Sequence, residues 1–477
     1  MARRTKIVAT LGPASERPSS LERLLRAGVD VVRLNLSHGT LDEHLERLEQ
    51  VRKTAAMIGR SVGVLADLPG PKIRSGPFPE GGVALVAGAY LRLRAGDHGS
   101  DAGTVWVDYD TLLEDLRVGD RVILGDGAIS MRVTRKEVDG AEAMIETGGR
   151  TQGRPGVHMA SDRMRLATPT DEDLVLAERM AAAGVEFIAV SFVRRAADVE
   201  KVRAVVGDRA ELVAKIETST ALGHLAEILE VSDAIMVARG DLGIDCPLED
   251  VPHLQKQIVR QCVEYGIPVI TATQMLESMI HAPSPTRAEV TDVANAIFDG
   301  TDALMLSGET AVGHDPSLVV STMATIAARA EAEASYRQWA ARLGRIQRQR
   351  WASVDDKITA ALTHAASQAA EDVEAVAILC CTTTGRTARA MARFRPNAQL
   401  IALSHRRHTV NALTLTWGVD PVEVGYYSST DEMVWFAVET AVQQGRIQSG
   451  DAVVVLAGSP ERSAETAADV LRIVQVA

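Results

Sequence analysis

The stretches that decide the fold read Glu-Leu-Val-Ala-Lys-Ile-Glu at residues 211–217 and Ala-Ile-Met-Val-Ala-Arg-Gly-Asp at residues 234–241. Each contains a short apolar run, typical of a fully buried strand, that ends directly in charged residues. Helical patterns separate such runs along the chain, which predicts β/α units in a parallel sheet. The charged residues then lie where each strand ends.

Six further apolar runs of this kind complete the pattern. The predicted strands are Lys6–Thr10, Val29–Leu34, Val62–Ala66, Phe187–Val190, Leu212–Ala214, Ala234–Val237, Val269–Thr271 and Ala303–Leu306. The helical stretches include Leu41–Met57, Asp171–Ala183, Ala196–Val206, Leu248–Tyr265 and Arg287–Phe298. Eight such strands predict a TIM (β/α)8 barrel, whose aliphatic interior suits a chain with only 4% aromatic residues.

One interval breaks this rhythm. Between residues 71 and 167, short alternating strands and Gly/Asp turns replace the helical pattern, which predicts a small all-β domain inserted after the third strand. An insertion there sits over the barrel mouth, where a lid belongs. Beyond a polar, Arg-rich stretch the β/α rhythm returns. We predict a catalytic barrel from residues 1–70 and 168–345, a β-barrel lid from residues 71–167, and a C-terminal α/β regulatory domain from residues 346–477.

The bulk composition excludes several classes of protein. The 477 residues carry a net charge of −12, which argues against nucleic acid as a partner. The four cysteines have neither the spacing of metal ligands nor that of a disulfide framework. No apolar segment approaches the ~20 residues that a membrane span needs. We therefore expect a cytoplasmic protein that binds no membrane.

Polar residues follow seven of the predicted strands. They are Asn35, Ser37, His38, Asp67, Ser191, Lys215, Glu217, Arg239, Gly240, Asp241, Thr273, Gln274, Ser307 and Glu309. In a barrel these strand ends converge on one face, where active sites form. Two carboxylates, those of Glu217 and Asp241, with room for water and substrate oxygens, describe a Mg²⁺ site. The alternative is a structural Lys215–Glu217 salt bridge inside the barrel.

Cationic side chains gather around the same predicted mouth, namely those of Arg33, Lys72, Arg74 and Lys215. At ~4 Å and an effective dielectric constant of about 20, each pairing with a substrate anion is worth about 4 kcal/mol before desolvation. This suits a small ligand with phosphate and carboxylate groups, and phosphoryl transfer needs mainly positioning and charge stabilisation. The chain has no Gly-x-x-x-x-Gly-Lys-Ser/Thr loop and no protein-kinase motif set. It is therefore neither a P-loop enzyme nor a protein kinase.

The motifs at these positions resemble those of the pyruvate kinase family. They are TKIVATLGP at residues 5–13, RLNLSHG at 33–39, GPKIR at 70–74, AKIE at 214–217, MVARGDLG at 236–243, ATQMLESM at 272–279, PTRAEV at 285–290 and MLSGETA at 305–311. The resemblance covers the whole chain and is closest in the barrel. It implies the glycolytic transfer of phosphate from phosphoenolpyruvate to ADP, giving pyruvate and ATP.

The resemblance also implies roles for the residues at the mouth. Glu217 and Asp241 are expected to ligate Mg²⁺, with Mn²⁺ as a substitute, and Lys215 to stabilise the transferring phosphoryl group and the enolate. Arg33 is expected to contact the phosphoryl group, and Thr273 to lie near the route by which the enolate is protonated. The remaining expected contacts are Gly240, Asp241, Thr273 and Ser191 to the substrate, and Arg74, Asn35 and His38 to the nucleotide.

The chain departs from the family pattern next to the third strand. Many members have Asp-Thr-Lys-Gly-Pro-Glu where this chain has Asp-Leu-Pro-Gly-Pro-Lys at residues 67–72, and those members resemble K⁺-activated enzymes. There, the positions of Asn35, Ser37, Asp67 and Leu68 would bind the monovalent ion. Lys72 brings a tethered positive charge to this place, so we expect activity that does not require K⁺.

Two further departures concern the nucleotide and regulation. The family's lid lysine is replaced by Pro155, and Arg154 is the expected substitute. In the C-terminal domain, a loop with Thr382, Thr384, Gly385 and Thr387 joins a strand to a helix and could cradle the phosphate of an effector. An ordinary threonine cap on that helix is the alternative.

Other functions remain open at this stage. One is a different Mg²⁺-dependent barrel enzyme acting on phosphoenolpyruvate or an oxoacid, such as an aldolase-like lyase. Another is a catalytically weak paralogue kept for effector binding. A homotetramer is an expectation from the family resemblance only.

Overall fold

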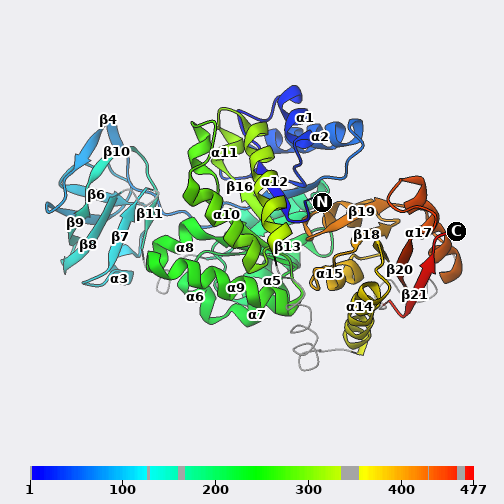
Figure 1. The fold of residues 1–477 in the computed structure, drawn as a ribbon. Coiled ribbons are helices and arrows are strands. Elements are labelled where there is room, and N and C mark those ends of the chain that lie inside the picture. Colours follow the sequence, from blue (N-terminus) through cyan, green and yellow to red (C-terminus); the bar gives the residue numbers. More distant parts are fainter. Residues whose placement is uncertain (1–2, 126–128, 160–166, 335–353, 428, 459–467) are drawn as a thin grey trace.

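The computed structural model describes residues 3–125, 129–159, 167–334, 354–427, 429–458 and 468–477. Its centre is a closed barrel of parallel strands in the order β1-β16-β15-β14-β13-β12-β3-β2 (Figure 1). The strands are β1 (Lys6–Thr10), β2 (Val31–Asn35), β3 (Gly63–Asp67), β12 (Phe187–Val190), β13 (Glu211–Ile216), β14 (Ala234–Ala238), β15 (Val269–Ala272) and β16 (Ala303–Leu306). The predicted TIM barrel is confirmed, and each predicted strand lies within two residues of an observed one.

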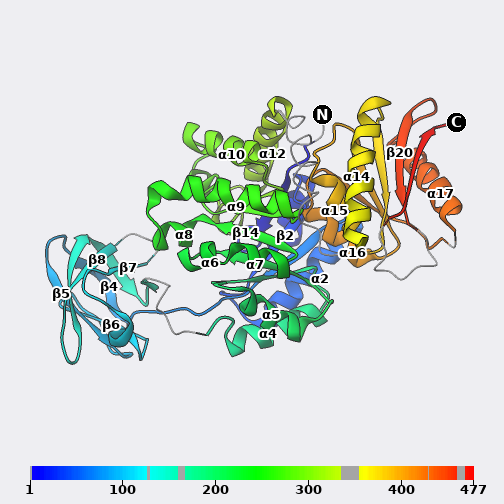
Figure 2. The same ribbon diagram turned by 90° about the horizontal axis from the view of Figure 1, so that it is seen from below.

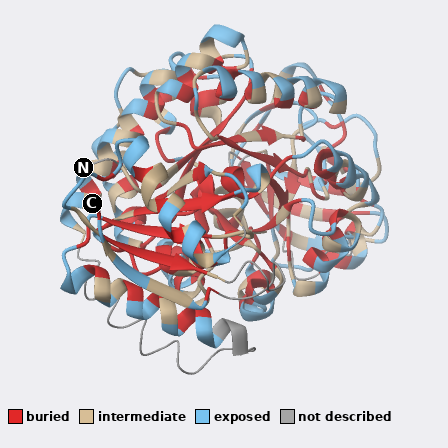
Figure 3. Ribbon diagram, turned by 90° about the vertical axis from the view of Figure 1, so that its right-hand side faces the viewer, coloured by how far each residue is buried: buried red, intermediate tan, exposed pale blue. Residues whose placement is uncertain are grey.

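Helices surround the barrel because each connection returns the chain to the start of the next parallel strand. They are α1 (Pro18–Arg26), α2 (Leu41–Met57), α4 (Asp171–Ala182), α5 (Ala196–Val206), α6 (Ser219–Gly223), α7 (Leu225–Val231), α8 (Arg239–Asp245), η1 (Leu248–Asp250), α9 (Val251–Tyr265), η2 (Glu277–Ile280), α10 (Arg287–Asp299), α11 (Gly308–Ala311) and α12 (Pro316–Glu333). Thr40 begins α2 and Thr286 begins α10, each through a capping box with a glutamate. The buried residues lie on the strands and the inner helix faces (Figure 3).

The lid is built from the segment between β3 and α4. Its elements are β4 (Phe78–Leu85), β5 (Tyr90–Ala95), β6 (Thr104–Val107), α3 (Leu112–Asp115), β7 (Arg121–Leu124), β8 (Ile129–Lys136), β9 (Ala141–Thr147), β10 (Gly149–Gly153) and β11 (Val157–His158). They form a two-stranded and a six-stranded sheet around a separate apolar core. Among the described residues of this segment, only the one-turn α3 departs from the all-β expectation. The segments around Ser75 and Pro155 lie side by side, since the Ser75 N–H donates to the Pro155 carbonyl at 2.9 Å.

The C-terminal part is a five-stranded sheet in the order β19-β18-β17-β20-β21, with β21 antiparallel (Figure 2). Its elements are α14 (Val354–Asp372), β17 (Ala377–Cys381), α15 (Arg386–Ala392), β18 (Gln399–Ser404), α16 (Arg407–Ala412), η4 (Leu413–Leu415), β19 (Val419–Glu423), α17 (Thr430–Gln443), β20 (Ala452–Ala457) and β21 (Val470–Gln475). The predicted boundary at residues 345 and 346 lies outside the described residues, and the other domain boundaries stay predictions. In the described part of the chain, no helix is both long enough and apolar enough to cross a bilayer.

The C-terminal part closes the base of the barrel. Ala412 and Leu415 belong to the apolar cluster inside the barrel, together with strand residues such as Val213 and Leu65. The Arg395 guanidinium, 1% exposed, forms an ion pair of 3.1 Å with Asp302 ahead of β16. The mouth at the other end of the strands is therefore the open end, and it faces the lid.

Candidate active site

A cavity of about 410 Å³ lies between the barrel mouth and the lid. Twelve of the predicted site residues line it, namely Arg33, Asn35, Ser37, His38, Asp67, Leu68, Lys72, Arg74, Ser191, Lys215, Glu217 and Asp241. The strand ends therefore converge as predicted. Polar side chains bring both signs of charge to this cavity, whereas an apolar cluster of strand residues lies inside the barrel.

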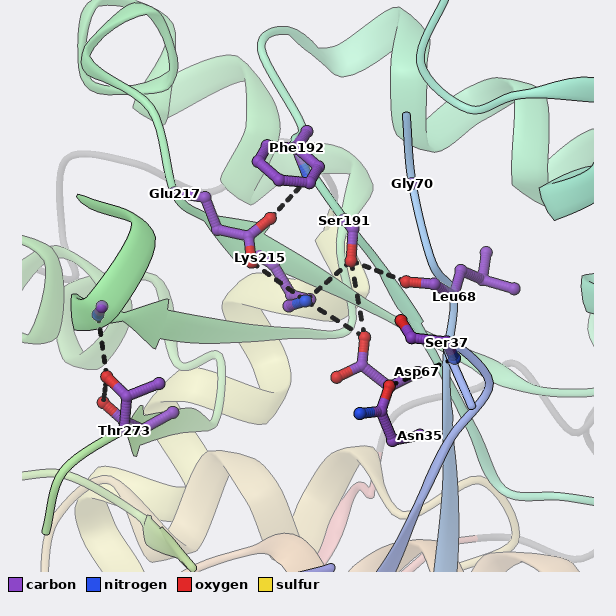
Figure 4. Close-up of polar contacts among 12 residues, drawn as sticks. Asn35, Ser37, Asp67, Leu68, Gly70, Ser191, Phe192, Lys215, Glu217 and Thr273 are labelled. Atoms are coloured by element: carbon purple, nitrogen blue, oxygen red, sulfur yellow. Dashed lines mark hydrogen bonds and ion pairs between the residues drawn. The ribbon is translucent and has the colours of Figure 1, made fainter. Parts of the chain in front are cut away.

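Lys215 lies at the centre of the polar contacts, with its side chain 11% exposed (Figure 4). Its Nζ donates to Ser191 Oγ at 2.7 Å and lies 3.2 Å from Asp67 Oδ1 and 2.9 Å from Glu217 Oε1. Burial alone would lower the pKa of Lys215, but the carboxylates of Asp67 and Glu217 outweigh it and raise this pKa above its usual value. The predicted alternative, a Lys215–Glu217 ion pair, is therefore present, but at the cavity wall rather than sealed in the core.

Glu217 is fixed from two sides. Its Oε1 pairs with Lys215, and its Oε2 accepts the backbone N–H of Phe192 at 2.6 Å. Burial, with the neighbouring charge of Asp241, raises the pKa of Glu217 to about 7 despite Lys215. Two carboxylates that repel each other at a cavity wall are suited to hold a hard divalent cation between them. The repulsion between the Glu217 and Asp241 carboxylates, which offer only oxygen atoms as ligands, fits a divalent metal ion.

The carboxylate of Asp67 contacts two cationic side chains. Its Oδ2 accepts from Arg33 Nε at 2.7 Å, and its Oδ1 faces Lys215. The desolvation of Asp67 opposes its charge, but Lys215 and Arg33 hold its pKa below the usual 3.8. Arg33 also donates to Thr10 Oγ1 at 3.1 Å. The two cations nearest the cavity floor are therefore set in place by one buried carboxylate.

Gly240 and Thr273 lie beside the cavity rather than in its lining. The Gly240 N–H donates to Thr273 Oγ1 at 2.8 Å, and Gly240 directly precedes Asp241 in α8. In Figure 4, Thr273 is apart from the contacts around Lys215. The structure therefore joins these two residues to each other and to the Asp241 end of the site.

The lid side of the cavity contains Lys72 and Arg74. The side chain of Lys72 reaches solvent, but the surrounding protein partly desolvates its ammonium group. This desolvation, with repulsion from Arg74 and Lys215, lowers the pKa of Lys72. Arg74 Nη1 donates to the Arg154 carbonyl at 3.2 Å. The Arg154 guanidinium pairs with Asp97 at 2.8 Å and with Asp108 at 3.1 Å, both within the lid. It is not among the cavity-lining residues, so its predicted nucleotide role stays a prediction.

The predicted effector loop follows β17. Thr382 Oγ1 accepts the Gly385 N–H at 2.9 Å, and Gly385 has a φ of +84° at the start of α15. The side chain of Thr387 is buried. A threonine turn therefore precedes the helix, but the expected threonine cap is wrong, because Gly385 is the N-cap of α15 and no side chain caps that helix. The effector role stays a prediction.

Several lining residues were missed by sequence reasoning. They are Thr218, Ile244, Asp245 and the lid residues from Gly156 to Met159, with Phe192 as a backbone donor. Ile244 and Asp245 come from the short α8, Thr218 and Phe192 follow β13 and β12, and the lid residues reach the cavity only through tertiary packing. Arg239 was expected at the mouth, but its side chain turns away toward Asp292 in α10.

Two family models match this chain, one over the barrel and the lid and the other over the C-terminal part. Family models described as "Pyruvate kinase, barrel domain" and "Pyruvate kinase, alpha/beta domain" match residues 2–320 and 360–474. A pyruvate kinase of Geobacillus stearothermophilus is 40% identical over 96% of this chain and 78% of its own length. One of Methylorubrum extorquens is 41% identical over 96% of this chain and 95% of its own length.

The fold and the site define a lidded (β/α)8-barrel enzyme of the phosphotransferase class. The matching family models and relatives show that the chain belongs to the pyruvate kinase family. Its activity is therefore that of a pyruvate kinase, and the family's requirement for a divalent metal agrees with the paired carboxylates.

Proposed function

We propose that the cavity transfers the phosphoryl group of phosphoenolpyruvate to ADP. The observation that carries this is the arrangement of Lys215 and Arg33, two cations oriented by the buried Asp67 carboxylate at the floor of a cavity roofed by the lid. Both substrates are anionic, and the fixed positive charge offsets their repulsion as they approach. The volume of about 410 Å³ suits small-molecule substrates.

In the reaction, a terminal phosphate oxygen of ADP attacks phosphorus and the bond from phosphorus to the enol oxygen breaks. The electron pair of that bond stays on the oxygen as an enolate, which becomes pyruvate when its terminal carbon takes a proton. Lys215 and Arg33 stabilise the charge that develops on the phosphoryl and enolate oxygens. Thr273, beside Gly240, lies on the side from which we propose that the proton arrives.

Glu217 and Asp241 would hold Mg²⁺, or Mn²⁺ as a substitute, and the metal supplies further charge neutralisation for the substrate oxygens. Ser191 holds Lys215 at 2.7 Å and so orients its ammonium group. Arg74, Asn35 and His38 line the part of the wall where we propose that the nucleotide binds.

Lys72 supports activity without K⁺. Both carboxylate oxygens of Asp67 are already engaged by Lys215 and Arg33, and Lys72 adds its charge to the same wall. We expect wild-type turnover to survive replacement of K⁺ and NH₄⁺ by a bulky organic cation. We expect Lys72→Met to lose turnover in that buffer, by about tenfold or more, and to regain part of it when K⁺ is added. A wild type that stops without K⁺ contradicts this proposal.

The remaining assignments rest on the same family membership. We propose a homotetramer in the cytoplasm, and a phosphorylated effector at the loop of Thr382, Thr384, Gly385 and Thr387. The four cysteines are free of disulfides, as a reducing compartment requires. Size-exclusion chromatography with light scattering tests the tetramer.

The test of the reaction is pyruvate release from phosphoenolpyruvate in the presence of ADP and Mg²⁺. We expect release that requires ADP and stops when the metal is chelated. Release without ADP indicates the aldolase-like or another oxoacid enzyme. No release, with intact ligand binding, indicates the catalytically weak paralogue.

A further inference from the structure

Arg239 has a charged side chain that the proposed reaction does not use. It stands between β14 and Gly240, but its side chain leaves the cavity and is only 13% exposed. Its Nε donates to the Ala272 carbonyl at 3.2 Å, and its Nη2 donates to the Thr273 carbonyl at 2.7 Å. One guanidinium therefore binds the last residue of β15 and the residue that follows it.

The far side of this guanidinium is fixed by two helices. Nη1 donates to Asp292 Oδ1 in α10 at 2.8 Å and to Gln255 Oε1 in α9 at 3.2 Å. Gln255 is itself held, because its Nε2 donates to Asp299 Oδ2 at 3.0 Å. A planar guanidinium with its donors engaged on both sides has little freedom to turn.

Thr273 needs such support because its backbone is strained. Its φ is +70°, and the φ of Gln274 is +54°, so the backbone of two successive non-glycine residues lies in the left-handed region. Such a conformation is strained and persists only where the surroundings impose it. In this conformation Thr273 Oγ1 accepts the Gly240 N–H at 2.8 Å and donates to the Ala272 carbonyl at 2.7 Å.

We infer that Arg239 is a positioning residue that holds the Thr273 hydroxyl at the edge of the active site, through the carbonyls of Ala272 and Thr273. Because Arg239 directly precedes Gly240 and Asp241, it also ties the start of α8 to the end of β15. The distance from the Thr273 hydroxyl to the Asp241 end of the site is thereby set. This inference rests on the proposed function, in which Thr273 acts on the substrate.

The first test compares Arg239→Met and Arg239→Lys with a matched control. Arg203 makes the same kinds of contact at the base of the barrel, with the carbonyls of Gly207 and Ala210 and with the Asp233 carboxylate. We expect Arg239→Met to lower kcat by about tenfold to a hundredfold with an unchanged KM for ADP. We expect Arg239→Lys to recover part of the loss and Arg203→Met to keep kcat. An unchanged kcat in Arg239→Met overturns the inference.

The second test is a double-mutant cycle with Thr273→Ala. If Arg239 acts through Thr273, its removal costs nothing further once the hydroxyl is gone, so the double variant matches Thr273→Ala in kcat. Losses that multiply show that Arg239 acts elsewhere and overturn the inference. Should Arg239→Met fail to fold, Asp292→Asn weakens the same support, and we expect the same dependence on Thr273.

A structural measurement keeps this inference separate from the proposed function. Wild type that releases no pyruvate refutes the function. Independently, a crystal structure of Arg239→Met, or of Asp292→Asn, shows whether Thr273 leaves its left-handed conformation and loses the Gly240 contact. We expect it to do so, and an unmoved Thr273 overturns the inference whatever the turnover.

Discussion

At the scale of single residues, the buried carboxylate of Asp67 organises the cavity floor. It neutralises Arg33 and Lys215 together, and these two cations would otherwise repel each other close to the apolar strand layers. Its pKa lies below the usual 3.8, because Lys215 and Arg33 overcome its desolvation. Asp67 therefore contributes stability above pH ~4, and this contribution is lost as the pH falls through its lowered pKa in the folded protein.

Asp67→Asn removes this neutralisation while keeping the shape of the side chain. Removing one partner of a buried ion pair costs about 3–5 kcal/mol, so we expect the unfolding free energy at pH 7 to fall by that order. Denaturant unfolding from pH 7 down to pH 3 measures the effect. The difference between wild type and variant should shrink toward the acid end. A difference that is constant with pH would show that the charge of Asp67 is not the cause.

The types of residue at the site were predictable, but the directions of their side chains were predicted only in part. A strand end in a parallel barrel identified Lys215, Glu217 and Asp67, since these ends meet at the mouth and alternate side chains point into it. Arg239 follows a strand in the same way but turns outward, because α8 begins there and changes the direction of the chain. Partners such as Asp292 are far from Arg239 in the sequence, so no local sequence pattern predicts that the two residues pair.

At the scale of elements, the crossing from β3 into the lid is tightly packed. Gly70 has a φ of +68°, and a Cβ placed there would lie 2.8 Å from both Phe192 Cδ2 and Ser191 Cβ. Those two neighbours matter because Ser191 holds Lys215, and the Phe192 N–H holds Glu217. A small change in this connection therefore acts on both catalytic side chains.

Gly70→Ala should lower turnover with phosphoenolpyruvate by about tenfold or more, because it displaces groups that position the site. Gly59→Ala is its matched control. Gly59 has a nearly equal φ of +67°, but nothing lies within 4 Å of an added Cβ. Both variants carry the left-handed strain of about 1–2 kcal/mol. Steady-state kinetics beside thermal unfolding separates the two effects. Equal turnover in the two variants would contradict this account.

The sequence predicted the long, periodic elements well and the short ones poorly. The bounds of α2 and α5 agree with the prediction at both ends, since each combines a clear apolar stripe with a definite start and stop. The short elements α6, α7 and α8 follow β13 and β14 and were not predicted. Helices of so few residues show no complete apolar period, and tertiary packing rather than propensity stabilises them.

At the scale of the whole molecule, the barrel, the lid and the C-terminal part make different contributions to the structure. The barrel supplies the catalytic wall, the lid brings its own core to the open end, and the C-terminal part places Ala412 and Leu415 inside the base. The Arg389 guanidinium of α15 pairs with Glu211, the first residue of β13, whose other end carries Lys215. This ion pair therefore joins the C-terminal part directly to the strand that carries Lys215.

The most direct measurement of the central claim is ADP-dependent pyruvate release by Lys215→Met. Lys53→Met is the control, because Lys53 lies on the outer face of α2 with its side chain 72% exposed. We predict that Lys215→Met keeps its fold but loses release by about a hundredfold or more, while Lys53→Met retains it. A Lys215→Met variant that releases pyruvate at the wild-type rate would contradict the account.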